Sequence, residues 1–217
     1  MKIMVICSVL LLLNSCVSVN YVDAIIPITQ KHRTIAVVPP SVTLERKNWM
    51  SEDHYKEITQ KKQSQLHAHL NRSFNRRVNE GRCFVEVLDP NATAYLTLSD
   101  DFNQGRISSK ELCKLLKVDA LFEFNIQILE PVSEFTALLF QETTGTILIT
   151  NQVFLTASLV DSLSNTPLFT LNASKMGTLG SIKQVMVNKV IRRATRNTPY
   201  NLKKNPYRKL YKNFLKP

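Results

Sequence analysis

The sequence VDALFEFNIQIL at residues 118–129 decides the fold that we predict for this chain. From Phe122 onward, apolar and polar side chains alternate, which is typical of a β-strand with one buried and one solvent-facing side. Just before it, SSKE at residues 108–111 has the pattern of a capping box, which predicts that a short helix begins there. A short helix that leads directly into a strand indicates a chain of mixed α and β structure.

Two more strands and a helix are expected after this stretch. Residues 146–160 are rich in Ile, Thr, Val and Phe, and residues 166–174 form a further strand-like run behind a turn at 161–165. Two such runs separated by a turn predict an antiparallel hairpin. Ser181 is a residue type that favours a helix N-cap, so we expect a last helix between it and Pro199.

The N-terminal half predicts two strands and a long helix. TIAVV at residues 34–38 is an unbroken apolar run closed by two prolines, as in a strand buried on both faces. Apolar residues recur at three- and four-residue spacing over 51–78, which predicts an amphipathic helix. CFVEVL at 83–88 predicts the next strand, and 91–100 fits either a short helix or a loop.

Together these elements predict an α/β (α+β) fold in the order β-α-β-α-β-β-β-α. We expect one mixed, mostly five-stranded sheet with helices packed on it. The early β-α units favour parallel pairing of the first three strands, and the hairpin adds antiparallel strands. With 217 residues, 44% of them hydrophobic, the chain can form a domain that needs no metal or disulfide to stabilise it.

The first residues have the pattern of a targeting signal. Residues 3–13 are an almost unbroken apolar run that spans about 16 Å as a helix, too short to cross a bilayer. LNSC at 13–16 resembles a bacterial lipobox, which implies that Cys16 becomes the first residue of the mature protein, with a diacylglycerol on its thiol and a third acyl chain on its amine. The alternative is ordinary signal cleavage after Ala24. Because Val17 rather than Asp follows the cysteine, the resemblance implies a lipid anchor in the outer membrane, on its periplasmic face.

These observations divide the chain into four parts. We expect a lipoprotein signal peptide at 1–15, a tether at 16–32, an α/β lipoprotein domain at 33–199 and a basic C-terminal tail at 200–217.

The net charge of +11 comes entirely from the C-terminal quarter. No acidic residue follows Asp161 but 12 Lys and Arg residues do, whereas the first 161 residues hold 16 basic and 17 acidic groups. Such a block favours an anionic or acidic partner, and the alternative is a basic face that only aids solubility. A periplasmic location argues against nucleic acid. It leaves outer-membrane lipid, bound through acylated Cys16, and an envelope protein or a second copy of this chain as partners.

Arginine and tyrosine are residue types that often anchor protein interfaces. The candidate partner-binding residues are Arg192, Arg193, Arg196, Tyr200, Lys203, Lys204, Tyr207, Arg208, Lys209 and Tyr211. For the aromatic residues of the tail, the alternative is that they fold back over the domain.

The sequence contains no recognisable catalytic or metal-binding constellation. His67 and His69 lie two positions apart on the expected helix, so they cannot ligate one metal ion. No glycine-rich phosphate loop or serine-nucleophile motif is present, and we therefore expect no enzyme activity, no metal and no cofactor. After signal cleavage and lipidation, Cys83 and Cys113 remain, and they form either a disulfide or two buried thiols.

Three segments together resemble a superfamily of bacterial outer-membrane lipoproteins: RTIAVVPP at 33–40, VDALF at 118–122 and LVDSLSNTPLF at 159–169. The superfamily includes the curli-secretion lipoprotein, lipoproteins that activate penicillin-binding proteins, and the N-terminal domain of the Tol translocation protein B. The connection expected at 132–146 is too short for the two membrane hairpins of its pore-forming members.

This resemblance implies a non-enzymatic, lipid-anchored periplasmic adaptor or scaffold that binds an envelope protein. The alternative is a structural subunit of an oligomeric outer-membrane assembly resembling the curli-secretion complex. An uncharacterised envelope enzyme is the second alternative.

Overall fold

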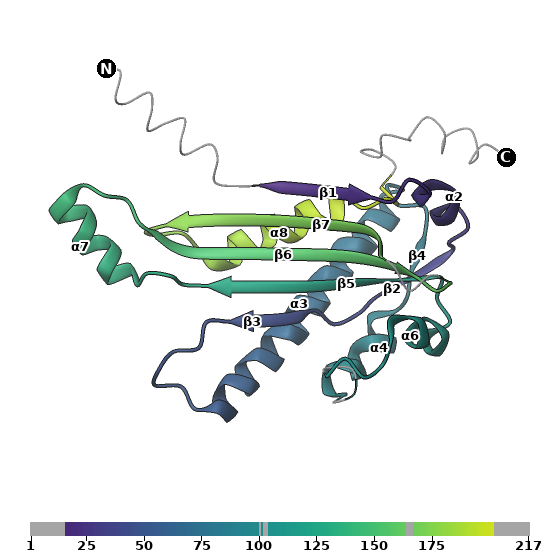
Figure 1. The fold of residues 1–217 in the computed structure, drawn as a ribbon, viewed down its shortest axis with the longest axis horizontal. Helices are drawn as coiled ribbons and strands as arrows, with labels where there is room; N and C mark the ends of the chain where they lie inside the picture. The colour runs from purple at the N-terminus through teal and green to yellow at the C-terminus, as the bar shows by residue number, and fades with distance from the viewer. Residues whose placement is uncertain (1–15, 100, 102–103, 164–166, 202–217) are drawn as a thin grey trace, which may run out of the picture.

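The computed structural model describes residues 16–99, 101, 104–163 and 167–201. Its centre is a mixed sheet of seven strands in the order β1-β7-β6-β5-β2-β4, with β3 paired to β5 (Figure 1). The mixed sheet with packed helices is therefore confirmed, with two more strands than the five expected.

Strand β5 (Ala120–Leu129) is the hub of the sheet. It pairs along its whole length with antiparallel β6 (Ile149–Asp161), while β2 (Thr34–Val37) and β3 (Ser41–Leu44) follow one another in parallel along its other edge. The buried side chains of β5 alternate from Phe122 onward, as the sequence pattern predicted.

The outer strands extend this arrangement in both directions. Strand β7 (Pro167–Thr178) forms the expected antiparallel hairpin with β6. On the other side, β4 (Glu86–Val87) pairs in parallel with β2, so the parallel pairing predicted for the early strands is confirmed. The strand expected over 83–88 is shorter than predicted.

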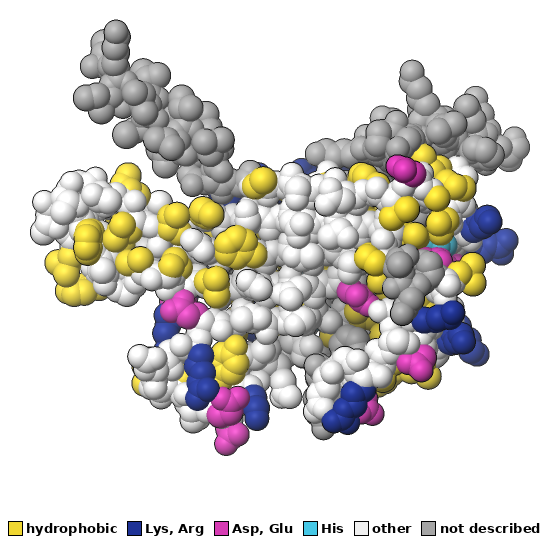
Figure 2. Space-filling view, in the orientation of Figure 1, with side chains coloured by type: hydrophobic (Ala, Val, Ile, Leu, Met, Phe, Trp, Pro, Cys, Tyr) yellow, Lys and Arg dark blue, Asp and Glu magenta, His cyan; other side chains and the backbone are white. Residues whose placement is uncertain are grey.

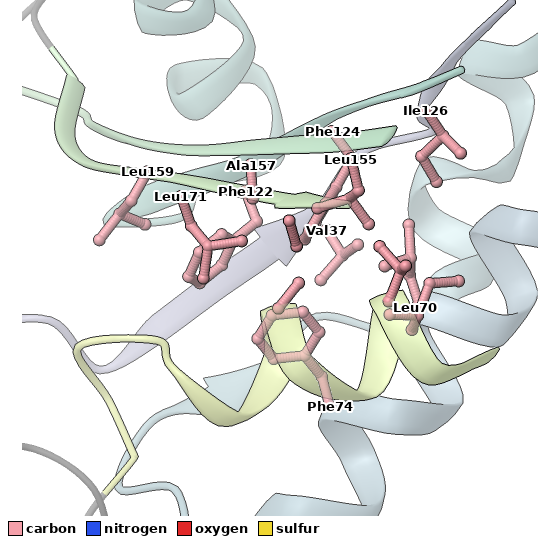
Figure 3. Close-up of a cluster of buried hydrophobic side chains, with 14 of the residues drawn as sticks. Val37, Leu70, Phe74, Phe122, Phe124, Ile126, Leu155, Ala157, Leu159 and Leu171 are labelled. Carbon is pink, nitrogen blue, oxygen red and sulfur yellow. The ribbon is translucent and has the colours of Figure 1, made fainter. Parts of the chain in front are cut away.

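Two helices cover one face of the sheet and enclose the main core. Helix α3 (Glu52–Asn79) begins with Ser51 as its N-cap, and helix α8 (Lys183–Arg196) packs beside it over β6 and β7. Figure 3 shows Leu70 and Phe74 of α3 reaching toward Phe122 and Leu155 of the sheet. Burial of these apolar side chains is the main favourable term in the stability of the fold.

A second, smaller core lies on the opposite face of β2 and β5. It is covered by the 3-10 helix η1 (Tyr95–Leu98) and α6 (Ser109–Leu116), and α4 (Pro90–Ala94) leads into η1. Within β2, Ile35 and Val37 face the main core, whereas Ala36 faces the small one. Because both faces are covered, this strand needs an unbroken apolar run.

The expected capping box is present at the start of α6. The Ser108 side chain accepts a hydrogen bond from the Glu111 backbone N–H, and the Glu111 carboxylate accepts one from the Ser108 backbone N–H. This pair satisfies two backbone donors that a helix N-terminus otherwise leaves open.

The segment expected to be a tether is part of the fold instead. Residues 17–21 form strand β1 (Val17–Tyr21), which pairs antiparallel with β7, and α2 (Ile25–Thr29) follows. The side chains of Val17 and Val19 pack against the main core. That contact explains why this stretch joins the sheet as an edge strand.

Three further local predictions differ from the structure. Strand β3 is not among the two strands expected in the N-terminal half, and the connection expected at 132–146 contains helix α7 (Glu134–Thr144). The last helix has Ile182 rather than Ser181 as its N-cap, with no side-chain cap.

The sheet has two distinct ends. Strands β5 and β7 end where α7 projects beyond the sheet (Figure 1). We call this the α7 end, and it includes the loop at 45–50 and the turn at 179–182. The opposite end carries α2, α4 and α6, and we call it the α6 end.

Candidate functional site

Cys16, the residue predicted to carry lipid, lies directly before the first strand. It is exposed, and its carbonyl oxygen accepts a hydrogen bond from the Ser174 backbone N–H at 3.0 Å. Val17 is level with Ala173 of β7, and β7 runs on from there to Thr178 at the α7 end. The chain therefore enters the sheet from the side of α7, and no linker separates Cys16 from the domain.

Helix α7 is a well-capped helix whose apolar side chains are not buried. Ser133 caps its first turn and Gly145, with φ of 70°, ends it in the left-handed conformation. Of its residues only Ala137 is buried. Its large apolar side chains are exposed: Phe135 by 69%, Leu138 by 43%, Leu139 by 48% and Phe140 by 47%. An apolar helix with this exposure is typical of a surface that meets a membrane or a partner.

More exposed apolar residues belong to the same end. Trp49, in the loop at 45–50, is 77% exposed, and Ile147 and Ile182 are exposed as well. Figure 2 shows yellow side chains gathered over the projecting α7 region. We call this surface, made of residues 135–140 together with Trp49, Ile147 and Ile182, the apolar end.

Ion pairs connect three chain segments at the α7 end of the sheet. Glu130, just after β5, contacts the ammonium groups of both Lys47 and Lys183. Lys47 also lies 3.2 Å from a carboxylate oxygen of Glu45. These contacts join the 45–50 loop, the start of α8 and the end of β5.

The candidate partner-binding residues separate into three groups. Arg192 is exposed and Arg193 and Arg196 are half-buried, all on the last turns of α8. Tyr200 is buried. Six others lie outside the described residues: Lys203, Lys204, Tyr207, Arg208, Lys209 and Tyr211.

The structure brings Arg192 and Arg196 next to basic residues that the sequence analysis did not single out. Together with the C-terminal part of α3 they line a cleft of about 260 Å³. Its arginines from the first half of the chain are Arg76, Arg77 and Arg82. The adjacent Arg-Arg pairs at 76–77 and 192–193 were the available sequence signal, but only the packing of α3 beside α8 shows that they meet.

The assignment of Tyr200 to a docking surface is wrong. Its side chain is 0% exposed and its ring lies edge-on to Phe84 and Phe122. The hydroxyl oxygen lies 2.5 Å from His32 Nδ1, and His32 Nε2 lies 2.9 Å from a carboxylate oxygen of Asp161. A carboxylate only accepts, so Nε2 donates to Asp161, and in the neutral ring Nδ1 accepts from Tyr200. The fold thus extends to residue 201, past the expected boundary at 199.

Cys83 and Cys113 are free thiols and not a disulfide. Both are buried, but Cys83 belongs to the main core and Cys113 to the small core on the other face of the sheet. Burial raises the pKa of each thiol to about 11, and the charge of Asp161 adds to the effect at Cys113. At neutral pH both stay protonated, and a protonated thiol is a poor nucleophile.

Asp119 and His67 are of residue types that can act in catalysis, but both contact backbone groups of the fold. The Asp119 carboxylate accepts hydrogen bonds from the backbone N–H groups of Arg33 and Thr34, at 2.7 and 2.9 Å. His67 is buried with Nε2 3.0 Å from the carbonyl oxygen of Val37, and burial lowers its pKa.

Within the described ranges, no group of three or more His, Cys, Asp or Glu side chains could hold a metal ion. No helix in that part of the chain has both the length and the apolar character needed to cross a membrane.

Comparison with known proteins gives likeness of fold only. No family model and no curated protein sequence matches the chain. Among solved structures, a PelC dodecamer from Paraburkholderia phytofirmans has 11% identity and a TM-score of 0.40, covering 82% of this chain and 93% of that one. The lipoprotein GNA1162 from Neisseria meningitidis has 13% identity and a TM-score of 0.42, covering 76% and 96%. The hypothetical protein CT253 from Chlamydia trachomatis has 12% identity and a TM-score of 0.36, covering 75% and 96%.

Proposed function

We propose that this chain is a lipid-anchored, non-enzymatic adaptor of the bacterial outer membrane. In this proposal the apolar end lies on the periplasmic surface of the bilayer, and the α6 end remains accessible to an envelope protein. One observation carries the proposal: the exposed apolar side chains of α7 lie toward the same end of the molecule as the residue predicted to be acylated.

The position of Cys16 at the start of β1 favours lipid as the partner that contacts the apolar end. From Ala173, level with Val17, the five residues of β7 to Thr178 span about 17 Å. Acyl chains on Cys16 would therefore hold α7 close to the headgroups. An apolar helix face enters a bilayer interface by about 5–10 Å, and two weak membrane signals together give stable anchoring where one does not.

The charges of α7 are compatible with this placement. Its carboxylates, Glu134 and Glu142, flank the stretch from Phe135 to Phe140. Residues 135–140 can thus contact acyl chains while both carboxylates stay among the headgroups, where charge costs little.

A photo-crosslinking amino acid at Phe140 tests the occupant in living cells. We expect a lipid adduct on the full-length protein, identified by mass spectrometry of the α7 peptide. The matched control is the same substitution at Leu163, an exposed apolar residue after β6 at the α6 end, where no lipid adduct is expected. A ladder of self-crosslinks from Phe140 would contradict the membrane placement and favour the oligomeric assembly.

A second experiment tests the anchor and the adaptor role together. Mass spectrometry of the N-terminal peptide should show Cys16 acylated, and Cys16→Ala should leave the protein unacylated. Cross-linking of the full-length lipoprotein in its own cells should then capture one envelope protein that the Cys16→Ala variant does not capture. If the unacylated variant captures the same protein equally well, the anchor has no part in the adaptor function.

A further inference from the structure

The C-terminal parts of α3 and α8 form a cleft with a strong excess of positive charge. It is lined by five arginines and a single carboxylate, that of Glu80, and we call it the arginine cleft. The arginines are Arg76, Arg77, Arg82, Arg192 and Arg196. His69 also lines it, and burial together with the charge of Arg72 lowers the pKa of His69, so this side chain adds no charge at neutral pH.

Glu80 forms ion pairs with only two of the five arginines. Its carboxylate oxygens lie 2.9 Å from Arg76 Nε and 2.9 Å from an amino group of Arg82. In the described part of the chain, no carboxylate pairs with Arg77, Arg192 or Arg196. Arg192 and Arg196 are four residues apart on α8, and this spacing places them on one side of the helix.

Arg77 is the central feature of the cleft. Its side chain is only 8% exposed, and its buried Nε atom has no hydrogen-bond partner. Burial lowers the pKa of Arg77, and the positive charge of Arg196 lowers it further. A buried guanidinium nitrogen without a hydrogen-bond partner destabilises a folded protein, and an anion bound beside it would offset that cost.

We propose that the arginine cleft binds a phosphate-bearing ligand. A phosphate group carries up to two negative charges and several acceptor oxygens, which suit guanidinium groups that donate in pairs. The cleft lies toward the α6 end, so in the proposed orientation it faces away from the anchoring membrane surface. The binding site therefore adds to the proposed adaptor function and does not depend on the acylation of Cys16.

Titration of the full-length acylated protein in nonionic detergent tests this site. The probes are inorganic phosphate, pyrophosphate and tripolyphosphate, with sodium chloride at matched ionic strength as the blank. We expect saturable binding that strengthens with phosphate number. The double variant Arg192→Gln, Arg196→Gln should weaken binding at least ten-fold, because it removes two of the three guanidinium groups that form no ion pair.

A charge-matched control separates a specific site from general attraction. Arg46→Gln with Arg106→Gln removes the same charge at two exposed surface ion pairs outside the cleft. We expect its affinity for tripolyphosphate to stay within two-fold of the parent protein. Equal weakening in both double variants, or no saturable binding of any probe, would overturn the proposal.

Substitution of Arg77 distinguishes a ligand-binding role from a structural one. Arg77→Met keeps a similar buried volume and removes the charge, so the melting temperature without ligand should stay unchanged or rise. The increase in melting temperature caused by tripolyphosphate should be lost. If the ligand-free protein instead melts at a lower temperature and still binds the probe, Arg77 is structural.

Two vesicle preparations identify the source of the phosphate. Phosphatidylcholine vesicles with and without phosphatidic acid are mixed with the unacylated Cys16→Ala protein, which lacks the acyl chains that would bind to either vesicle, and tripolyphosphate is added as competitor. Binding to phosphatidic acid that the Arg192→Gln, Arg196→Gln variant loses would assign a lipid phosphate. Binding of soluble phosphates without such a lipid effect would assign a soluble phosphate compound.

Discussion

At the scale of single residues, the contact between Tyr200 and His32 closes the C-terminal end of the fold. The two groups are 168 positions apart in sequence, and both are buried. We expect Tyr200→Phe to lower the free energy of unfolding by about 1–3 kcal/mol, because it leaves a buried imidazole nitrogen without its partner while keeping the ring. Urea denaturation followed by circular dichroism measures the change.

The matched control is Tyr21→Phe. The Tyr21 hydroxyl donates to the carbonyl oxygen of Asn197 at 3.2 Å in an exposed position, where water can replace it. Its loss should change the free energy of unfolding by less than about 0.5 kcal/mol. Equal effects of the two substitutions would show that the contact between Tyr200 and His32 stabilises the fold no more than an exposed hydrogen bond does.

At the scale of elements, the pairing of β1 with β7 determines whether Cys16 is held against the domain or joined to it by a flexible tether. The Ser174 N–H donates to the carbonyl oxygen of Cys16, and the Val22 N–H donates to the carbonyl oxygen of Leu168. Every second residue from Cys16 to Val22 therefore directs its N–H group toward β7. Ser18 is one of these. We expect Ser18→Pro to lower the free energy of unfolding by about 1–3 kcal/mol by removing a ladder hydrogen bond, measured by urea denaturation.

Ser18→Ala keeps the backbone N–H and is the control for this prediction. Its exposed side chain contributes little, so stability should change by less than about 0.5 kcal/mol. A proline variant as stable as the alanine variant would mean that residues 17–21 act as a tether in solution.

The elements that the sequence predicted are those with a complete local signal. The long helix at 51–78, the capping box at Ser108 and the alternation after Phe122 each depend on residues close in sequence, and each is present. Residues 17–21 carry a weaker pattern, and they form a strand because β7 offers an open edge and the core accepts two valines. A local pattern cannot show either condition.

The candidate surfaces were harder to predict than the elements. Residues 138–140, LLF, are apolar enough to be expected in a core, and only the projection of α7 beyond the sheet shows that they are exposed. The arginine cleft joins residues 76–82 to residues 192–196, and their meeting depends on the packing of α3 against α8. The C-terminal basic block indicated half of this site, and the other half comes from a helix with no unusual charge.

At the scale of the whole molecule, the single tryptophan of the chain reports its orientation. Trp49 belongs to the apolar end, so in proteoliposomes of the acylated protein we expect brominated lipids to quench its fluorescence. The comparison variant moves the probe to the other end: Trp49→Phe with Tyr95→Trp places it in η1, beside α4, at a position that is also exposed. Its quenching should be several-fold weaker, because the sheet separates the two ends. Equal quenching at both positions would mean that the domain has no fixed orientation, and stronger quenching at residue 95 would place the α6 end against the bilayer.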